Sequence, residues 1–100
     1  MIFDIKEQDG GMYATLSGRL DTPAAAKAQQ EITPLLENAD KQIVLDLTDL
    51  QYISSSGLRL LLIIRKQAHE KGGAVIIEHV NDEIMNVFRM TGFISMFEIR

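Results

Sequence analysis

Three consecutive serines followed by a glycine are the residues of this chain best placed to do chemistry. Ser54-Ser55-Ser56-Gly57 leads from a loop into a helix predicted to run to about Lys71. The first amides of a helix have no intrahelical partner and carry partial positive charge, so an anion such as a phosphoryl group is readily accommodated there. Serine is also a preferred helix N-cap. The spacing alone therefore allows two interpretations, a helix cap and a hydroxyl that accepts phosphate.

Catalytic and metal-binding interpretations have less support. The carboxylates of Asp21, Asp46 and Asp49 could be imagined as a metal or acid–base cluster, but turn, cap and strand-end positions explain them better. Gly-x-Ser-x-Gly is absent, and His69 and His79 lie near a helix end and a strand end, where solvated side chains are expected. The chain has no cysteine, which excludes a cysteine nucleophile. From these features together we expect neither an enzyme nor a metal or cofactor site.

Length and composition predict one compact domain over residues 1–100, since 46% of the residues are hydrophobic. The formal charge is −4 and the basic residues are scattered, which disfavours nucleic-acid binding. Residues 1–7 lack the features of a secretory signal. The longest apolar run, Leu60 to Ile64, is far shorter than the roughly 20 residues that span a bilayer. We expect a cytoplasmic protein without direct membrane insertion.

Hydrophobic periodicity predicts alternating strands and helices. Residues 2–6 and 12–16 alternate with period two around Asp9-Gly10-Gly11, which indicates a hairpin. Apolar runs at 41–47 and 74–78 indicate buried strands, residues 48–53 read as a loop, and 93–99 should add a last short strand. The order ββαβαβαβ predicts an α/β fold, a mixed sheet packed with helices.

Three helices are expected from their caps and stops. The first begins at Thr22 as cap with Pro23 at the first helical position, and it kinks or restarts at Pro34. The second ends at Gly72-Gly73, and the third runs from an Asn81 cap to Gly92. The predicted inner faces are Ala25, Ala28, Ile32 and Leu35 or Leu36 in the first helix, and Ile84, Val87, Phe88 and Thr91 in the third.

Some apolar residues allow more than one placement. In the helix after the serines, one set is Leu58, Leu61 and Leu62, and a second is Leu60, Ile63 and Ile64. One set should meet the sheet, and the remainder either packs under a neighbouring helix or meets a partner. Met85, Met90 and Met96 are expected to fill the core.

The serine segment resembles the signature of the STAS family, in which Asp-Ser-Ser-Gly-Leu or Asp-Ser-Thr-Gly-Leu opens a helix after an aromatic–aliphatic pair. Here Tyr52-Ile53-Ser54-Ser55-Ser56-Gly57-Leu58 occupies those places, with Ser54 where the family has aspartate. Ser17-Gly18-Arg19-Leu20-Asp21 is similar to the family's Gly-x-Leu-Asp. Val87 to Phe93 is similar to its helix ending in Ser/Thr-Gly. These matches cover nearly the whole chain.

The resemblance is to STAS domains of the anti-sigma factor antagonist type, and it implies the SpoIIAA-like fold, a mixed sheet of about four to five strands packed with about three to four helices. In that type the serine two positions before the glycine is phosphorylated, which falls on Ser55, with Ser56 and Ser54 as alternatives. The implied partners are an anti-sigma factor that is also a serine kinase, and a PP2C-type phosphatase. The expected partner-binding residues are Asp21, Ser54, Ser56, Gly57, Leu58 and Arg59.

The same family also implies a second role. STAS domains serve as non-phosphorylated partner subunits in lipid-transport and stressosome-like complexes. The two roles can be distinguished by testing whether a cognate kinase phosphorylates Ser55.

Overall fold

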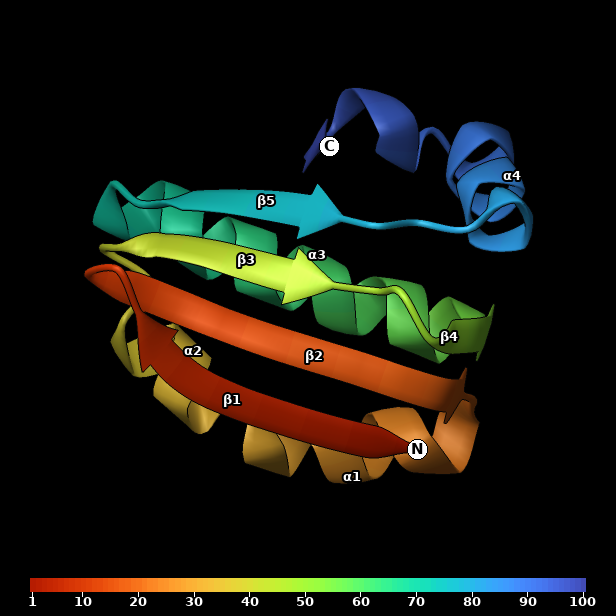
Figure 1. Ribbon diagram of the computed structural model, residues 1–100, viewed down its shortest axis with the longest axis horizontal. Coiled ribbons are helices and arrows are strands. Elements are labelled where there is room, and N and C mark those ends of the chain that lie inside the picture. Colours follow the sequence, from red (N-terminus) through yellow and green to blue (C-terminus); the bar gives the residue numbers. More distant parts are fainter.

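The computed structural model describes all 100 residues as a mixed β-sheet layered against helices (Figure 1). The strands are β1 (Ile2–Gln8), β2 (Gly11–Leu20), β3 (Gln42–Asp46), β4 (Leu50–Ile53), β5 (Ala74–Glu78) and β6 (Glu98–Ile99). Their order across the sheet is β1-β2-β3-β5-β6, and β4 pairs with the end of β2. β1 is antiparallel to β2, whereas all the other pairings are parallel. The predicted mixed α/β sheet is confirmed.

Four helices accompany the sheet, and three of them lie on one side of it (Figure 1). The four helices are α1 (Thr22–Glu31), α2 (Thr33–Glu37), α3 (Ser55–Lys71) and α4 (Asp82–Thr91), followed by a short 3-10 turn, η1 (Phe93–Ser95). Figure 1 shows α1, α2 and α3 behind the sheet, while α4 lies beyond the end of β5 and no helix crosses the near face. None of the helices combines the length and the apolar character needed to cross a bilayer.

Local sequence explains where these elements begin and end. Asp9 and Gly10 both have positive φ, 54° and 77°, as a two-residue turn matched to strand twist requires, and the predicted hairpin is confirmed. The helical pattern breaks before Pro34, where α2 restarts. Gly72 ends α3 in the left-handed conformation with φ 81°. The Asn81 side chain caps α4 by accepting from the amide of Ile84 at 2.9 Å.

The core lies between the sheet and the helices. Alternate residues of β2, β3 and β5 point toward α1 and α3 because successive side chains of a strand face opposite sides. The buried cluster includes Ala14, Leu16, Ile43, Leu45, Val75 and Ile77 from the strands and Ala25, Ala28, Leu60, Leu61 and Ile64 from the helices. The predicted inner face of the first helix is confirmed, with Ile32 and Leu35 fully buried.

The structure corrects three predictions about local structure. Residues 50–53, expected as loop, form β4 because they pair with the end of β2. The cap of α1 is Asp21 and not Thr22: the Asp21 carboxylate accepts from the Ala24 amide at 3.0 Å. Most of 93–99 is not strand, since η1 occupies 93–95 and only Glu98–Ile99 pairs with β5.

Several side chains also lie elsewhere than predicted. Met90 is 86% exposed and Met96 41% exposed, so these methionines are not core filler, and Met85 is only half-buried. Thr91 is exposed, although it was expected on the inner face of α4. In α3 neither of the two predicted apolar sets is buried as a whole. The buried stripe takes Leu60, Leu61 and Ile64, while Leu58, Leu62 and Ile63 are half-buried.

Candidate functional site

The candidate site lies where two paired strands end and two helices begin. β2 ends at Leu20, and α1 starts directly after it, while β4 ends at Ile53, and α3 starts directly after that. Because Leu20 and Ile53 are register partners in parallel strands, both helix N-termini emerge side by side at one end of the sheet (Figure 1). The strand pairing therefore brings Asp21 and the serine segment together.

Ser54 is the N-cap of α3 and is almost fully buried, at 9% exposure. Its Oγ accepts a hydrogen bond from the Gly57 amide at 3.1 Å and donates one to the Leu20 carbonyl at 3.0 Å. Its backbone amide donates to the same carbonyl at 2.9 Å. This hydroxyl therefore both donates and accepts a hydrogen bond, and the two bonds hold the start of α3 against the end of β2.

Ser55 is the first residue of α3 and is exposed, and its hydroxyl makes no hydrogen bond within the chain. Ser56 is half-buried. At this end of the helix the leading amides are free of intrahelical partners, so a phosphoryl group on Ser55 would meet hydrogen-bond donors and the positive end of the helix dipole. The arrangement suits modification of Ser55 far better than modification of Ser54.

Gly57 explains how close α3 comes to the sheet. A Cβ atom at this position would lie 2.8 Å from Ile53 Cγ1 and 2.8 Å from Leu20 Cγ, distances that real Cβ atoms do not show. The absence of a side chain therefore lets the first turn of α3 rest directly on β2 and β4. Gly57 positions the serines and offers no surface of its own, because it is buried.

A groove beside the serines separates α1 from α3. Its volume is about 140 Å³, and its lining includes Thr22, Ala25, Ser56, Arg59 and Ile63. Arg59 is exposed, and it lies four residues after Ser55, one helical turn along the same face. Leu58, the remaining predicted contact residue, is half-buried.

A stacked pair at this edge was missed by the sequence analysis. The Arg19 guanidinium lies 4.3 Å from the centroid of the Tyr52 ring, and the two residues are register partners in β2 and β4. Arginine over tyrosine is a favourable cation–π geometry. Both side chains are exposed. The pairing of Arg19 with Tyr52 was not predicted because residues 48–53 were interpreted as a loop, and a loop implies no cross-strand neighbour.

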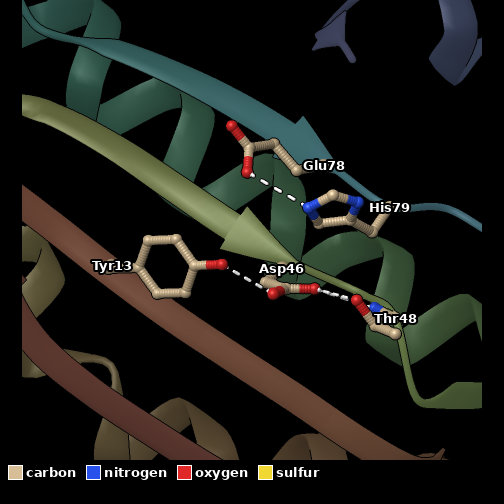
Figure 2. Close-up of polar contacts among 5 residues, drawn as sticks. All are labelled: Tyr13, Asp46, Thr48, Glu78 and His79. Atoms are coloured by element: carbon tan, nitrogen blue, oxygen red, sulfur yellow. Dashed lines mark hydrogen bonds and ion pairs between the residues drawn. The ribbon is translucent and has the colours of Figure 1, made fainter.

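A polar network lies at the end of β3 (Figure 2). Tyr13 Oη donates to Asp46 Oδ2 at 2.6 Å, and the Thr48 amide donates to Asp46 Oδ1 at 2.9 Å. Burial by itself would raise the pKa of the Asp46 carboxyl, but the hydrogen bonds from Thr48 and Tyr13 outweigh it and keep this pKa below its ordinary value. The hydrogen bond to Asp46 raises the pKa of Tyr13 to about 12.

The three carboxylates weighed as a cluster have separate surroundings. Asp21 caps α1, Asp46 accepts from Thr48 and Tyr13, and Asp49 is exposed in the turn before β4. No three acidic or histidine side chains are grouped where they could hold a metal ion. His69 and His79 are both exposed, as the sequence predicted.

These features define a small α/β domain whose sheet is backed by helices on one side and carries an exposed serine at the start of a helix. The STAS domain family model matches residues 3–100, and the chain belongs to this family. The predicted family is thereby confirmed, and the superposition on SpoIIAA confirms the SpoIIAA-like fold.

Relatives and solved structures agree with this assignment. The chain is 32% identical to BtrV of Bordetella bronchiseptica, a candidate anti-sigma factor antagonist, over 91% of this chain and 78% of the relative. It is 26% identical to the anti-sigma-B factor antagonist of Bacillus subtilis, over 96% and 87%. The unphosphorylated form of the anti-sigma factor antagonist SpoIIAA superposes with a TM-score of 0.83 at 21% identity, over 99% and 88%. The phosphorylated form of the Bacillus cell fate determinant SpoIIAA gives 0.75 at 19% identity, over 99% and 91%.

Proposed function

We propose that this STAS domain is an anti-sigma factor antagonist that binds an anti-sigma factor with serine kinase activity and is switched off by phosphorylation of Ser55. Binding would free the sigma factor and so regulate transcription in the cytoplasm, without catalysis by this chain. The observation that carries the proposal is the division of labour between adjacent serines. Ser54 is buried and engaged at both hydroxyl functions, whereas Ser55 is exposed and unengaged.

The relatives support the choice of partner. BtrV and the Bacillus subtilis protein carry the name of anti-sigma factor antagonist, and SpoIIAA has been solved in a phosphorylated form. Ser54 accepts from the Gly57 amide as an aspartate at the same place could. The replacement of the family's aspartate therefore keeps the helix cap and adds no second accessible hydroxyl.

The proposed switch is electrostatic. A phosphoserine adds about −1.5 to −2 charges at neutral pH, and the partner-facing surface around it consists of Asp21, Ser56, Leu58 and Arg59. Arg59, one turn away, would pair with the phosphate and so be withdrawn from the partner. Because the start of a helix tolerates negative charge, the modification should abolish binding while leaving the fold intact.

The test is phosphorylation of the purified protein by ATP and an anti-sigma factor of the serine kinase class, with the labelled residue located by mass spectrometry. We expect label on wild type, Ser54→Ala and Ser56→Ala, and none on Ser55→Ala. Ser95→Ala, an exposed serine on η1, is the matched control and should be labelled like wild type. Label that persists undiminished on Ser55→Ala would refute the site assignment.

A second readout separates binding from modification. Ser55→Asp should weaken capture of the kinase and Ser55→Ala should retain it, and neither should lower the melting temperature substantially. A large loss of melting temperature on phosphorylation would contradict the electrostatic account. If the kinase binds but labels no serine, the non-phosphorylated partner role becomes the better description. PP2C-type phosphatase treatment of the labelled protein should restore capture.

A further inference from the structure

The sheet has one side that no helix covers. The strands β1, β2, β3 and β5 are backed by α1, α2 and α3 on one side only (Figure 1). Parallel sheets are almost always covered on both faces, because their strands are apolar on both sides and the backbone must be shielded. This uncovered side, termed the bare face, is formed by Asp4, Lys6, Tyr13, Thr15, Val44, Asp46, Ile76 and Glu78.

The middle of the bare face is apolar. Tyr13, Val44 and Ile76 are successive register partners across β2, β3 and β5, so their side chains form one row. Tyr13 and Val44 are half-buried. Ile76 is only 2% exposed and yet stands outside the core cluster, because it points away from the helices. A partner could therefore bury the Tyr13–Val44 surface without displacing any element of this chain.

A row of carboxylates runs beside the apolar row. Asp4 pairs with Thr15, Thr15 with Asp46, and Asp46 with Glu78, so three acidic side chains lie along one line across four strands. Asp46 and Glu78 are direct neighbours (Figure 2), and like charges directly opposite each other destabilise a sheet. The depressed pKa of Asp46 keeps it ionised.

Few cations of this chain lie close to this row of carboxylates. Lys6 Nζ lies 5.4 Å above the centroid of the Tyr13 ring. His79 Nε2 lies 3.7 Å from Glu78 Oε2, and its side chain is 63% exposed. Asp4 takes part in none of the ion pairs of the structure, which join Lys41 to Glu7, His79 to Glu78 and Arg100 to Glu98. Asp46 is held by hydrogen bonds from Tyr13 and Thr48, and Glu78 is paired only with the exposed His79. The bare face is therefore an apolar strip beside a row of carboxylates that no Lys or Arg of this chain pairs with.

We propose that the bare face is a docking surface for a basic amphipathic helix of a protein partner, separate from the Ser55 site. The apolar stripe of such a helix would lie on Tyr13 and Val44, and its Lys or Arg residues would meet Asp4, Asp46 and Glu78. A helix is the element that covers parallel sheets in α/β folds. A second copy of this chain is disfavoured as occupant, because face-to-face pairing would bring the same carboxylates together.

The probe is a synthetic amphipathic peptide of about 18 residues, with leucine on one face and lysine on the other, which spans about 27 Å as a helix. This length matches the 30 × 27 Å extent of the molecule. A second peptide with glutamate in place of lysine is the control probe. Binding is followed by amide chemical shifts of the isotope-labelled, full-length protein, which report both the affinity and the position of the peptide.

The expected result is binding of the lysine peptide alone, with shifts concentrated on β2, β3 and β5. The double variant Asp4→Asn/Glu78→Gln should weaken binding on the order of tenfold, because it removes two ion pairs with the peptide, one at the exposed Asp4 and one at the half-buried Glu78. The matched variant Asp40→Asn/Glu70→Gln removes the same charge from exposed positions elsewhere and should change affinity less than about twofold.

Three outcomes would overturn the proposal. These are shifts centred on α1, α3 or the Ser55 site, equal losses in the two double variants, and equal binding of the glutamate peptide. Val44→Lys adds a test of the apolar row, since a lysine there should abolish binding while circular dichroism shows an intact fold. Retained binding by Val44→Lys would likewise refute the docking geometry. Phosphorylation of Ser55 should be unaffected by Asp4→Asn/Glu78→Gln, which keeps the two sites distinguishable.

Discussion

Replacing Ser54 by alanine tests directly whether this serine, and not Ser55, holds the start of α3. Ser54 Oγ is the only side-chain acceptor for the Gly57 amide and also donates to the Leu20 carbonyl. Alanine removes both hydrogen bonds and leaves the Gly57 amide unpaired in a buried position. The Leu20 carbonyl stays partnered, because the backbone amide of residue 54 still donates to it.

The expected loss of unfolding free energy follows from the two hydrogen bonds that Ser54→Ala removes. Loss of a serine N-cap costs about 1 kcal/mol, toward about 2 kcal/mol at buried sites, and loss of a second buried hydrogen bond costs about 1 kcal/mol. Ser54→Ala should therefore lower the free energy of unfolding by about 2 kcal/mol. In a domain of this length that corresponds to a drop in melting temperature of roughly 10 °C.

Urea and thermal unfolding of Ser54→Ala, Ser55→Ala and Ser54→Asp test whether Ser54 is the N-cap of α3. Ser55→Ala is the matched control and should stay within about 0.5 kcal/mol of wild type, because its hydroxyl is exposed and makes no hydrogen bond. Ser54→Asp should recover part of the loss, since a carboxylate can accept from the Gly57 amide but cannot donate to Leu20. Equal stability of Ser54→Ala and Ser55→Ala would refute the assignment of Ser54 as the cap.

Two further predictions concern the contact of Gly57 with the sheet and the polar network at Asp46. Gly57→Ala should destabilise the protein by up to about 2 kcal/mol in urea unfolding, because overpacking against Leu20 costs about 1–3 kcal/mol and the better helix propensity of alanine offsets about 1 kcal/mol of it. A variant more stable than wild type would contradict the close contact of Gly57 with Leu20. For the network at Asp46, the pKa of Tyr13 at about 12 exceeds its unfolded value of 10.0, so this hydrogen bond stabilises the fold fully below about pH 10 and the benefit is lost as the pH rises to about 12. Asp46→Asn should return the pKa of Tyr13 toward 10 in a titration followed by ring resonances, and an unchanged value would show that Asp46 is not the cause.

Local patterns predicted most of the secondary structure because they depend on short-range interactions. The hairpin at Asp9-Gly10, the break before Pro34 and the stop at Gly72 each follow from backbone conformations that only certain residues adopt readily. The errors fell where a distant partner decides the outcome. Residues 50–53 carry no strong strand pattern and become β4 only through pairing with β2.

In the candidate site, too, local sequence predicted one part and the tertiary structure decided the rest. Position at a helix start marked each of the three serines as a possible cap, but which of them is the cap depends on how α3 is placed against β2. The cap of α1 shows the same limit, since Asp21 and Thr22 are both good capping residues and the backbone at the end of β2 selects Asp21. The Arg19–Tyr52 stack required the β2–β4 register, which composition and spacing do not specify.

The sequence by itself determined the α/β class, the ends of most helices and the resemblance that pointed to Ser55, because periodicity, caps and motif spacing are encoded within a few residues. Only the tertiary structure decided that Ser54 is buried while Ser55 is exposed, since this depends on the approach of α3 to Leu20, 34 residues away in the chain. The bare face is likewise a property of the packed molecule. Strand order and the placement of the helices on one side align carboxylates from β1, β3 and β5 that no local pattern connects.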